Sequence, residues 1–402
     1  MEKEGKSGDF MLTSIALILL MGLLIGWVFS KLKLPNLLGM IIVGILLSPH
    51  ALNLLDDSII TISSELRQIA LVIILTRAGL SLDVSDLKRV GRPAILMCFV
   101  PACIEIIGTI LFAPIFLGVS LLEAAVIGSV IAAVSPAVIV PRMIKLIDEG
   151  YGKSKSIPQL VLASAAVDDV FVIVMFTAFT GLAKTGSMEI TSFLQIPISI
   201  LLGIVLGACI GFVLVLYFKK FHMRDSVKIM IILSISFLLL ELETRLQGYI
   251  PISGLLAIMS MGIVIKQKYN ILAQRLAAKY NKLWLGAEVF LFVLVGATVD
   301  LKYVASAGLS AVLLIVAVLL FRMFGVFISL LKTNLSKEER LFCMIAYMPK
   351  ATVQAAIGAI PLSMGISCGN IVLTVAVLSI LITAPLGAIL VDNLYKRLLQ
   401  KD

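Results

Sequence analysis

Residues 160–182 read LVLASAAVDDVFVIVMFTAFTGL. This run is almost wholly apolar and, at about 1.5 Å per helical residue, it is long enough to cross the roughly 30 Å hydrocarbon core of a bilayer. Two adjacent carboxylates, Asp168 and Asp169, interrupt it. Ionisable residues at membrane depth are costly and by default mark a functional site. The stretch therefore predicts a transmembrane helix that carries a pair of carboxylates for a cation or proton pathway.

The composition of the whole chain agrees with a membrane protein. Of the 402 residues, 60% are hydrophobic and only 14% are charged, which excludes a soluble domain with a polar surface. The net charge of +9 arises in short loops between apolar runs, so we expect no nucleic-acid partner. The five cysteines are odd in number and lie in apolar segments, which predicts neither a disulfide framework nor a resident metal site.

The hydropathy pattern predicts an all-α polytopic membrane protein with about thirteen transmembrane helices. Most of the 33 lysine and arginine residues fall in the loops after every odd-numbered helix up to the eleventh, and in the C-terminal tail. Because positive residues stay in the cytoplasm, we expect the N-terminus outside and the C-terminus inside. The predicted spans cover residues 11–30, 35–49, 66–82, 91–118, 122–144, 157–182, 191–218, 227–243, 250–265, 283–299, 303–331, 338–362 and 368–392.

A self-comparison of the chain indicates an internal repeat. Residues 79–83 read GLSLD and residues 296–300 read GATVD, displaced by 296 − 79 = 217 positions. Prolines recur at nearly the same offset, pairing Pro35 with Pro251 and Pro136 with Pro349. The offset superposes helices 1 to 6 on helices 8 to 13 and leaves the seventh as a linker.

Seven helices separate equivalent points, and this odd number predicts that the two halves are inverted in the membrane. We expect a first repeat over residues 1–182, a linker over 183–224 and a second repeat over 225–402. Inverted repeats with interrupted helices at matching positions are typical of secondary transporters, whose site lies near the bilayer midplane. The same offset pairs Glu105 with Arg322. Since arginine does not release its proton, this pair is expected to be a structural lock more than a transport element.

Two of the predicted helices contain a proline that should break them. Pro136 follows Ser135, and Pro349 precedes Lys350 and, two residues further, Thr352. Proline removes a backbone donor and clashes with the preceding turn, so each break frees carbonyl groups and helix-dipole ends near the midplane. We therefore predict two crossing broken helices, with hydroxyl groups at the breaks that either bind the ion or cap the freed backbone.

The charged residues can be assigned roles on this frame. Asp168 and Asp169 are about 100° apart around their helix and cannot face the same partner. We predict that Asp169 carries the ion and that Asp168 pairs with Lys350. A carboxylate can bind either a proton or a hard cation such as Na⁺ or Li⁺, and competition between the two is the mechanism of an antiporter. Lys350 is alternatively a structural partner or a second proton carrier.

Two motifs match a known family. The Ser135-Pro136 break, followed about thirty residues later by Asp168-Asp169, resembles the cation:proton antiporter superfamily. Residues 348–358, MPKATVQAAIG, resemble the branch that includes the animal sodium/proton exchangers of subfamily B and their bacterial relatives. We expect a bacterial sodium/proton antiporter, with roles in pH homeostasis and sodium tolerance, in the inner membrane.

Further residues fit the same branch, namely the VGA at 295–297 together with Glu105 and Arg322. The resemblance implies a homodimer with a fixed dimerisation domain made of helices 1–3 and 7–10. It also implies a core of residues 91–182 and 303–392 that moves in an elevator-like manner. Many electrogenic members place a lysine in the helix equivalent to 303–331, where this chain has Arg322.

The resemblance also implies the site. Asp168 and Asp169 would be the ion-binding pair, while Lys350 and the Glu105–Arg322 pair would shape it. The transported Na⁺ or Li⁺ and H⁺ would be the substrates, with no cofactor and no enzymatic activity.

Three other functions compete with this prediction. A sodium-coupled carrier of an organic solute would need a roomy polar or aromatic pocket, which two tryptophans and few polar residues make difficult. An intramembrane aspartyl protease needs two aspartates facing each other from different helices, whereas these are neighbours on one helix. A channel would show a selectivity motif, and none is apparent.

Overall fold

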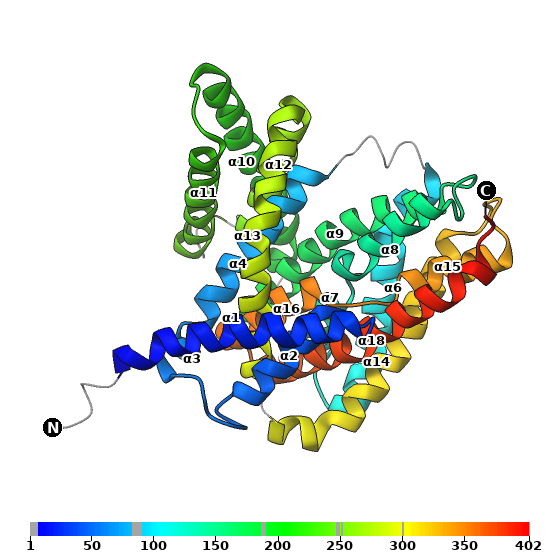
Figure 1. Cartoon of the computed structure of the whole chain (residues 1–402), viewed down its shortest axis with the longest axis horizontal. Helices are drawn as coiled ribbons and strands as arrows, with labels where there is room; N and C mark the ends of the chain where they lie inside the picture. The colour runs from blue at the N-terminus through cyan, green and yellow to red at the C-terminus, as the bar shows by residue number, and fades with distance from the viewer. Residues whose placement is uncertain are drawn as a thin grey trace.

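The computed structural model describes residues 7–82, 91–185, 190–246, 250, 252–299 and 301–401 (Figure 1). Its regular structure in these residues is helical, apart from one isolated bridge between Tyr151 and Lys401. The helices are α1 (Ser7–Lys31), α2 (Asn36–Leu47), α3 (Asp57–Thr61), α4 (Ser63–Ser81), α6 (Arg92–Leu117), α7 (Leu121–Ile131), α8 (Pro136–Glu149), α9 (Ile157–Thr185), α10 (Ile190–Lys220), α11 (Asp225–Leu246), α12 (Gly254–Lys268), α13 (Asn270–Ala297), α14 (Leu301–Ser329), α15 (Lys337–Ala346), α16 (Thr352–Ile357), α17 (Ile360–Ser363) and α18 (Gly369–Leu398).

Within the described residues, eight helical segments are long and apolar enough to cross a membrane. The chain is therefore a multi-pass membrane protein. The other predicted spans coincide with helices that are shorter or carry more charge, such as α2, α4, α11 and α12. The eight segments are Phe10–Lys31, Arg92–Leu117, Leu121–Glu149, Ile157–Ala183, Ile198–Lys220, Asn270–Ala297, Gly308–Ser329 and Gly369–Leu398.

Most helix boundaries lie within a few residues of their predicted positions, and α13 is the main exception. It begins at Asn270, whereas hydropathy placed its start near residue 283. The added turns are rich in alanine, leucine, lysine and arginine, which favour helix without being apolar as a group. Hydropathy detects only the apolar part of such a helix.

The two predicted breaks are present. The first crossing segment is α7 followed by α8, separated by residues 132–135, with Pro136 as the first residue of α8. The second is α15 followed by α16, separated by residues 347–351. Proline is compatible with the first position of α8, because a backbone N–H at that position has no acceptor within the helix. In Figure 1, α7 and α16 lie in the middle of the view, between α4, α10, α12 and α13 on one side and α6, α8, α9 and α15 on the other.

Glycines allow several of these helices to approach closely. A methyl group on Gly79 of α4 would lie 2.5 Å from the carbonyl oxygen of Met259 in α12. A methyl group on Gly296 of α13 would overlap the carbonyl oxygen of Ile41 in α2. Both glycines belong to the predicted repeat motif. The aspartates that end this motif, Asp83 and Asp300, and the predicted repeat proline Pro251 lie outside the described residues.

Candidate functional site

The two helix breaks meet in the interior of the protein. The backbone N–H of Ser135, in the first break, donates a 2.8 Å hydrogen bond to the carbonyl of Pro349, in the second. Pro349 also packs against Gly387 of α18, where a larger residue would overlap its ring. Helices α6, α9 and α14 bring charged side chains to this crossing. The site therefore combines freed backbone groups with buried charges.

Arg322 of α14 lies at the centre of the charged cluster. Its Nη1 is 3.0 Å from Glu105 Oε2 on α6, and its Nη2 is 2.9 Å from Asp168 Oδ2 on α9. Its Nε donates a 2.8 Å hydrogen bond to the carbonyl of Tyr347, at the end of α15. All three charged side chains are fully buried. The structure thus brings Glu105 and Arg322 together, and adds Asp168 to the same guanidinium.

Lys350 pairs with a different carboxylate from the one predicted. Its Nζ lies 2.6 Å from Glu105 Oε1 and donates a 2.5 Å hydrogen bond to the carbonyl of Ile131. The predicted Asp168–Lys350 pair is therefore wrong. The physical reason is that Asp168 Oδ2 already accepts from Arg322 and from the backbone N–H of Val134, at 2.8 Å. The ammonium group instead reaches the open carbonyl end of α7, beside Glu105.

The freed backbone groups of the first break have side-chain partners. The carbonyl of Ala132 accepts from Arg322 Nη1. The carbonyl of Ala133 accepts a 2.9 Å hydrogen bond from Nε2 of Gln354, on α16. These bonds offset the penalty of burying helix-end carbonyls without water. Positive charge at the C-terminal end of α7 is also favourable for the helix dipole.

Gln354 and Thr383 belong to the site, although sequence reasoning did not single them out. Gln354 is 1% exposed and braces the break described above. Thr383 of α18 accepts a 2.9 Å hydrogen bond from the backbone N–H of Lys350 through its Oγ1. A signal for Gln354 was present, because it is a polar residue in an apolar run, four positions after Lys350. Thr383 gave none, since hydroxyl residues are common in membrane helices.

Several buried oxygen atoms at the crossing have no hydrogen-bond partner among the described residues. They include Asp168 Oδ1, Asp169 Oδ1 and Ser135 Oγ, and also Gln354 Oε1 and Tyr347 Oη. Carboxylate and hydroxyl oxygens are the ligands that hard cations prefer, and a carboxylate can instead take a proton. Each of the three predicted ion-binding residues therefore has an unused oxygen atom, and their binding of an ion stays a prediction.

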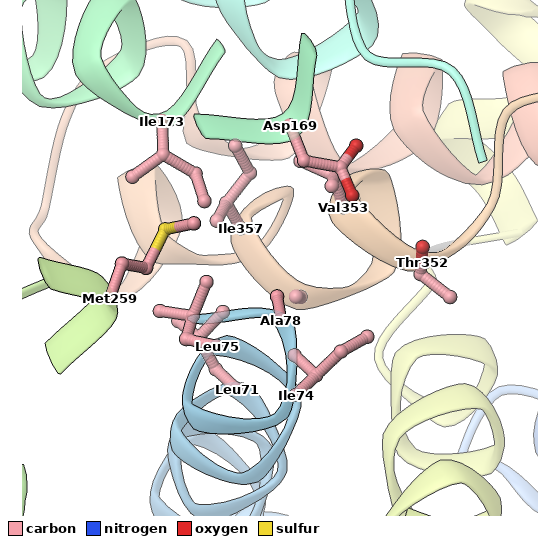
Figure 2. Close-up of a pocket in the computed structure, with 11 residues that line it drawn as sticks. Leu71, Ile74, Leu75, Ala78, Asp169, Ile173, Met259, Thr352, Val353 and Ile357 are labelled. Atoms are coloured by element: carbon pink, nitrogen blue, oxygen red, sulfur yellow. The ribbon is translucent and has the colours of Figure 1, made fainter. Parts of the chain in front are cut away.

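Asp169 also borders a small cavity, drawn in Figure 2. The cavity has room of about 20 Å³, close to that of a single water molecule. In Figure 2 the oxygen atoms belong to Asp169 and Thr352, and the other labelled lining residues are apolar. Its walls come from α9 and α16 on one side and from α4 and α12 on the other. Asp169 therefore lies at the boundary between two groups of helices, whereas Asp168 faces the charge cluster.

The cluster leaves one carboxylate without a partner of opposite charge. Lys350 pairs with Glu105, and Arg322 pairs with Glu105 and Asp168. No described lysine or arginine lies within ion-pair distance of Asp169. The arrangement can accept one additional positive charge at Asp169, as a proton or as a cation.

Comparison with known proteins gives a consistent family. The family model described as "Sodium/hydrogen exchanger, transmembrane" matches residues 15–394. Sodium/hydrogen exchanger 9B2 of Mus musculus is 33% identical over 92% of this chain and 69% of its own length. Sodium/hydrogen exchanger 9B1 of Homo sapiens is 31% identical over 92% of this chain and 73% of its own length.

The fold has a solved counterpart. The structure of the sodium proton antiporter MjNhaP1 from Methanocaldococcus jannaschii at pH 8 superposes with a TM-score of 0.83. The match covers 97% of this chain and 99% of that one at 22% sequence identity, so it supports the fold. The family match spans nearly the whole chain and includes both helix breaks and the five charged residues of the site, Glu105, Asp168, Asp169, Arg322 and Lys350. The chain therefore belongs to the sodium/hydrogen exchanger family and is a transporter, not an enzyme.

Proposed function

We propose that this transporter exchanges Na⁺ or Li⁺ for H⁺ by alternating access, with Asp169 as the carboxylate that binds one or the other. Asp168 and Ser135 supply further oxygen atoms to the cation. The two similar proteins and the similar solved structure described above are sodium/hydrogen exchangers and a sodium proton antiporter, which supports these substrates. The transported ions are the substrates, and a resident cofactor is not needed.

The observation that carries this proposal is the uneven pairing of the five charged residues of the site, which are Glu105, Asp168, Asp169, Arg322 and Lys350. Four of them neutralise one another, and Asp169 alone borders the cavity without a partner among the described residues. An unpaired buried carboxylate is unstable as an anion and therefore binds whatever positive charge can reach it. A proton and a small cation compete for the same atoms.

The same pairing supports a stoichiometry of one proton per cation. With all five groups ionised, three carboxylates and two cationic side chains leave a net charge of −1. One Na⁺ or one proton at Asp169 neutralises the cluster in either case. Moving net charge through the low dielectric of a membrane is costly. The site therefore moves between the two sides of the membrane with Na⁺ or a proton bound at Asp169, when its net charge is zero.

We further propose that thirteen helices form two inverted repeats, over residues 1–182 and 225–402, joined by a linker over 183–224. Close contacts at equivalent positions support this arrangement. Gly79 of the first repeat packs on α12 of the second, and Gly296 of the second packs on α2 of the first. Glu105 and Arg322, 217 positions apart, contact each other as two residues beside a pseudo-twofold axis would.

The repeats would be divided into a mobile core and a fixed dimerisation domain. The core would consist of residues 91–182 and 303–392, which include all five charged residues of the site. The dimerisation domain would comprise the first three predicted helices and those from the seventh to the tenth, and would form a homodimer. The position of Asp169 supports an elevator-like movement, because its cavity lies between core helices α9 and α16 and the helices α4 and α12.

The location follows from the charge distribution along the chain. The excess of lysine and arginine in alternate loops supports an external N-terminus and a cytoplasmic C-terminus. We place the protein in a bacterial inner membrane, where sodium/proton exchange would serve pH homeostasis and sodium tolerance. A sodium-coupled organic solute carrier is disfavoured, because the cavity beside Asp169 holds about 20 Å³.

The test is a transport assay in proteoliposomes with an imposed pH gradient. Lumenal pH is followed as Na⁺, Li⁺ or K⁺ is added to vesicles with the wild type or Asp169→Asn. We expect Na⁺ or Li⁺ to drive proton movement in the wild type and not in the variant. Asp148→Asn, at an exposed aspartate of α8, is the matched control and should retain exchange. Folded wild-type protein without cation-driven proton flux would refute the proposal.

A further inference from the structure

Two half-helices of the crossing begin with the same capping box. At the start of α7, Ser120 Oγ accepts from the N–H of Glu123, and Glu123 Oε2 accepts from the N–H of Ser120. At the start of α15, Ser336 and Glu339 make the same reciprocal pair. The two boxes are 336 − 120 = 216 positions apart. A capping box needs no further partner to fix the start of a helix.

Each capping glutamate nevertheless makes a second contact, with a loop of the opposite repeat. Glu123 Oε1 accepts a 2.6 Å hydrogen bond from Ser367 Oγ, in the loop between α17 and α18. Glu339 Oε2 lies 2.8 Å from Lys155 Nζ, in the loop between α8 and α9. The two contacts are equivalent in the proposed repeat. They differ in chemistry, since one is a hydrogen bond from a hydroxyl group and the other is an ion pair.

The two contacts lie at opposite ends of the core. Ser367 lies two residues before the start of α18, and the loop that carries Lys155 is hydrogen-bonded to the segment just after the other end of α18. The N–H of Gly152 in this loop donates a 2.8 Å hydrogen bond to the carbonyl of Gln400. With 30 residues α18 is about 45 Å long, so the two contacts lie near its opposite ends.

The C-terminal end of each half-helix supplies a backbone carbonyl that accepts a hydrogen bond from a cationic side chain of the site. The carbonyl of Ile131, at the end of α7, accepts from Lys350, and the carbonyl of Tyr347, just after α15, accepts from Arg322. With 11 and 10 residues, these half-helices are about 15 Å long. Each is therefore held at its outer end by a cross-repeat contact and at its inner end by a site charge.

We propose that Glu123–Ser367 and Glu339–Lys155 are two latches, one at each end of the core, that hold the crossing half-helices in the geometry that binds the ion. The four residues are positioning residues and do not touch the ion. The inference rests on the proposed function and adds residues to it that lie outside the charge cluster. It gives the capping glutamates a role in ion affinity beyond helix capping.

Opening a latch should lower ion affinity more than turnover. A released half-helix samples positions in which its carbonyl no longer meets Lys350 or Arg322, so the binding-competent fraction falls. The apparent KM rises in inverse proportion to that fraction, while the chemistry of the loaded site is unchanged. The effect should be larger for Glu339, whose side chain is 3% exposed, than for the exposed hydrogen bond of Ser367.

The Glu339–Lys155 ion pair can be removed by substitution while the Ser336–Glu339 capping box is kept. Glutamine at the third helical position also completes a capping box, so Glu339→Gln keeps the helix start and loses only the ion pair. We would compare Glu339→Gln, Lys155→Met and the double variant, with Lys153→Met, an exposed lysine of the same loop, as the matched control.

The other latch is tested in the same way, with Glu123→Gln, Ser367→Ala and the double variant. Ser363→Ala is the control, because its hydroxyl bonds only the carbonyl of Ile360 in its own helix. Each variant is measured for Tm of the purified protein and for KM and kcat of Na⁺-driven proton movement in proteoliposomes.

We expect each single variant at the Glu339–Lys155 latch to raise the KM for Na⁺ about threefold with nearly unchanged kcat. On a logarithmic scale this is about half of a tenfold step in affinity. The double variant should be no worse than either single variant, in KM and in Tm, because both changes remove one contact. The controls should match the wild type.

Additive effects of the two partners would overturn the proposal, as would single variants that match their controls. Coupled Tm values with an unchanged KM would also overturn it, since the contacts would then be structural only. If the wild type itself transported no cation, the proposed function would fail. The Tm values of the single and double variants would still show whether the contacts stabilise the core. Failure of the proposed function can therefore be distinguished from failure of the latch proposal.

Discussion

Membrane voltage should not shift the equilibrium of exchange. Among the five charged residues of the site, Glu105, Asp168 and Asp169 are negative and Arg322 and Lys350 are positive, which leaves −1 before loading. One Na⁺ or one proton brings the cluster to zero, so a complete cycle moves one positive charge each way. Exchange is then electroneutral, and its reversal point depends only on the two ion gradients.

The alternative stoichiometry predicts a large and measurable shift. With two protons per cation, one net charge crosses per cycle, and 100 mV contributes about 2.3 kcal/mol. Since about 1.4 kcal/mol corresponds to a tenfold change in an equilibrium ratio, the cation ratio at which flux reverses would move about 50-fold. The predicted shift for one proton per cation is zero.

The assay is a reversal measurement in proteoliposomes. The voltage is clamped at zero or at about 100 mV with a potassium gradient and a potassium ionophore. The sodium ratio is then varied until no proton movement is seen at a fixed pH difference. An unchanged null point at both voltages agrees with the charge count, and vesicles with Asp169→Asn report the leak. A null point displaced by about 50-fold would show that a second group in the cluster releases a proton, and would refute the pairing argument.

Further predictions concern the stability of the site and of the helix packing. Lys350→Met should lower the free energy of unfolding by about 3–5 kcal/mol, because it leaves one partner of a buried ion pair, and denaturant or thermal unfolding in detergent checks this. Gln354→Leu should cost about 1–3 kcal/mol by leaving a buried carbonyl unpaired, and an unchanged Tm would contradict the bracing role. Gly296→Ala should cost about 1–3 kcal/mol, since the added methyl group overlaps the carbonyl of Ile41. Gly286→Ala, with open space around it in the same helix, should instead be neutral or stabilise by up to about 1 kcal/mol in the same unfolding assay.

Local features of the chain were sufficient to predict the helices and their breaks. The apolar runs located most of the helices, and Pro136 and Pro349 located the two interruptions. The pairing of Glu105 with Arg322 could also be anticipated, because the predicted repeat relates their positions. The early start of α13 was missed, since its first turns are polar and are helical for reasons other than hydropathy.

The partners of the buried charges could not be read from the chain in the same way. Lys350 was assigned to Asp168, yet its ammonium group reaches Glu105 on a helix more than two hundred residues away. Choosing between two carboxylates depends on where three helices and two extended segments cross, to within about an ångström, because hydrogen bonds weaken steeply with distance and angle. No local propensity carries that information.

Hydropathy, charge and proline positions alone therefore dictate a polytopic helical membrane protein with paired carboxylates and two broken helices, because each of these is a short-range property of the chain. The tertiary structure decided which carboxylate each cation neutralises and that Gln354 and Thr383 brace the breaks. It also decided that Asp169 lies beside a cavity, without an ion-pair partner in the part of the chain that the structure describes. These features depend on side chains from helices far apart in sequence, and only their packing brings them within hydrogen-bond reach.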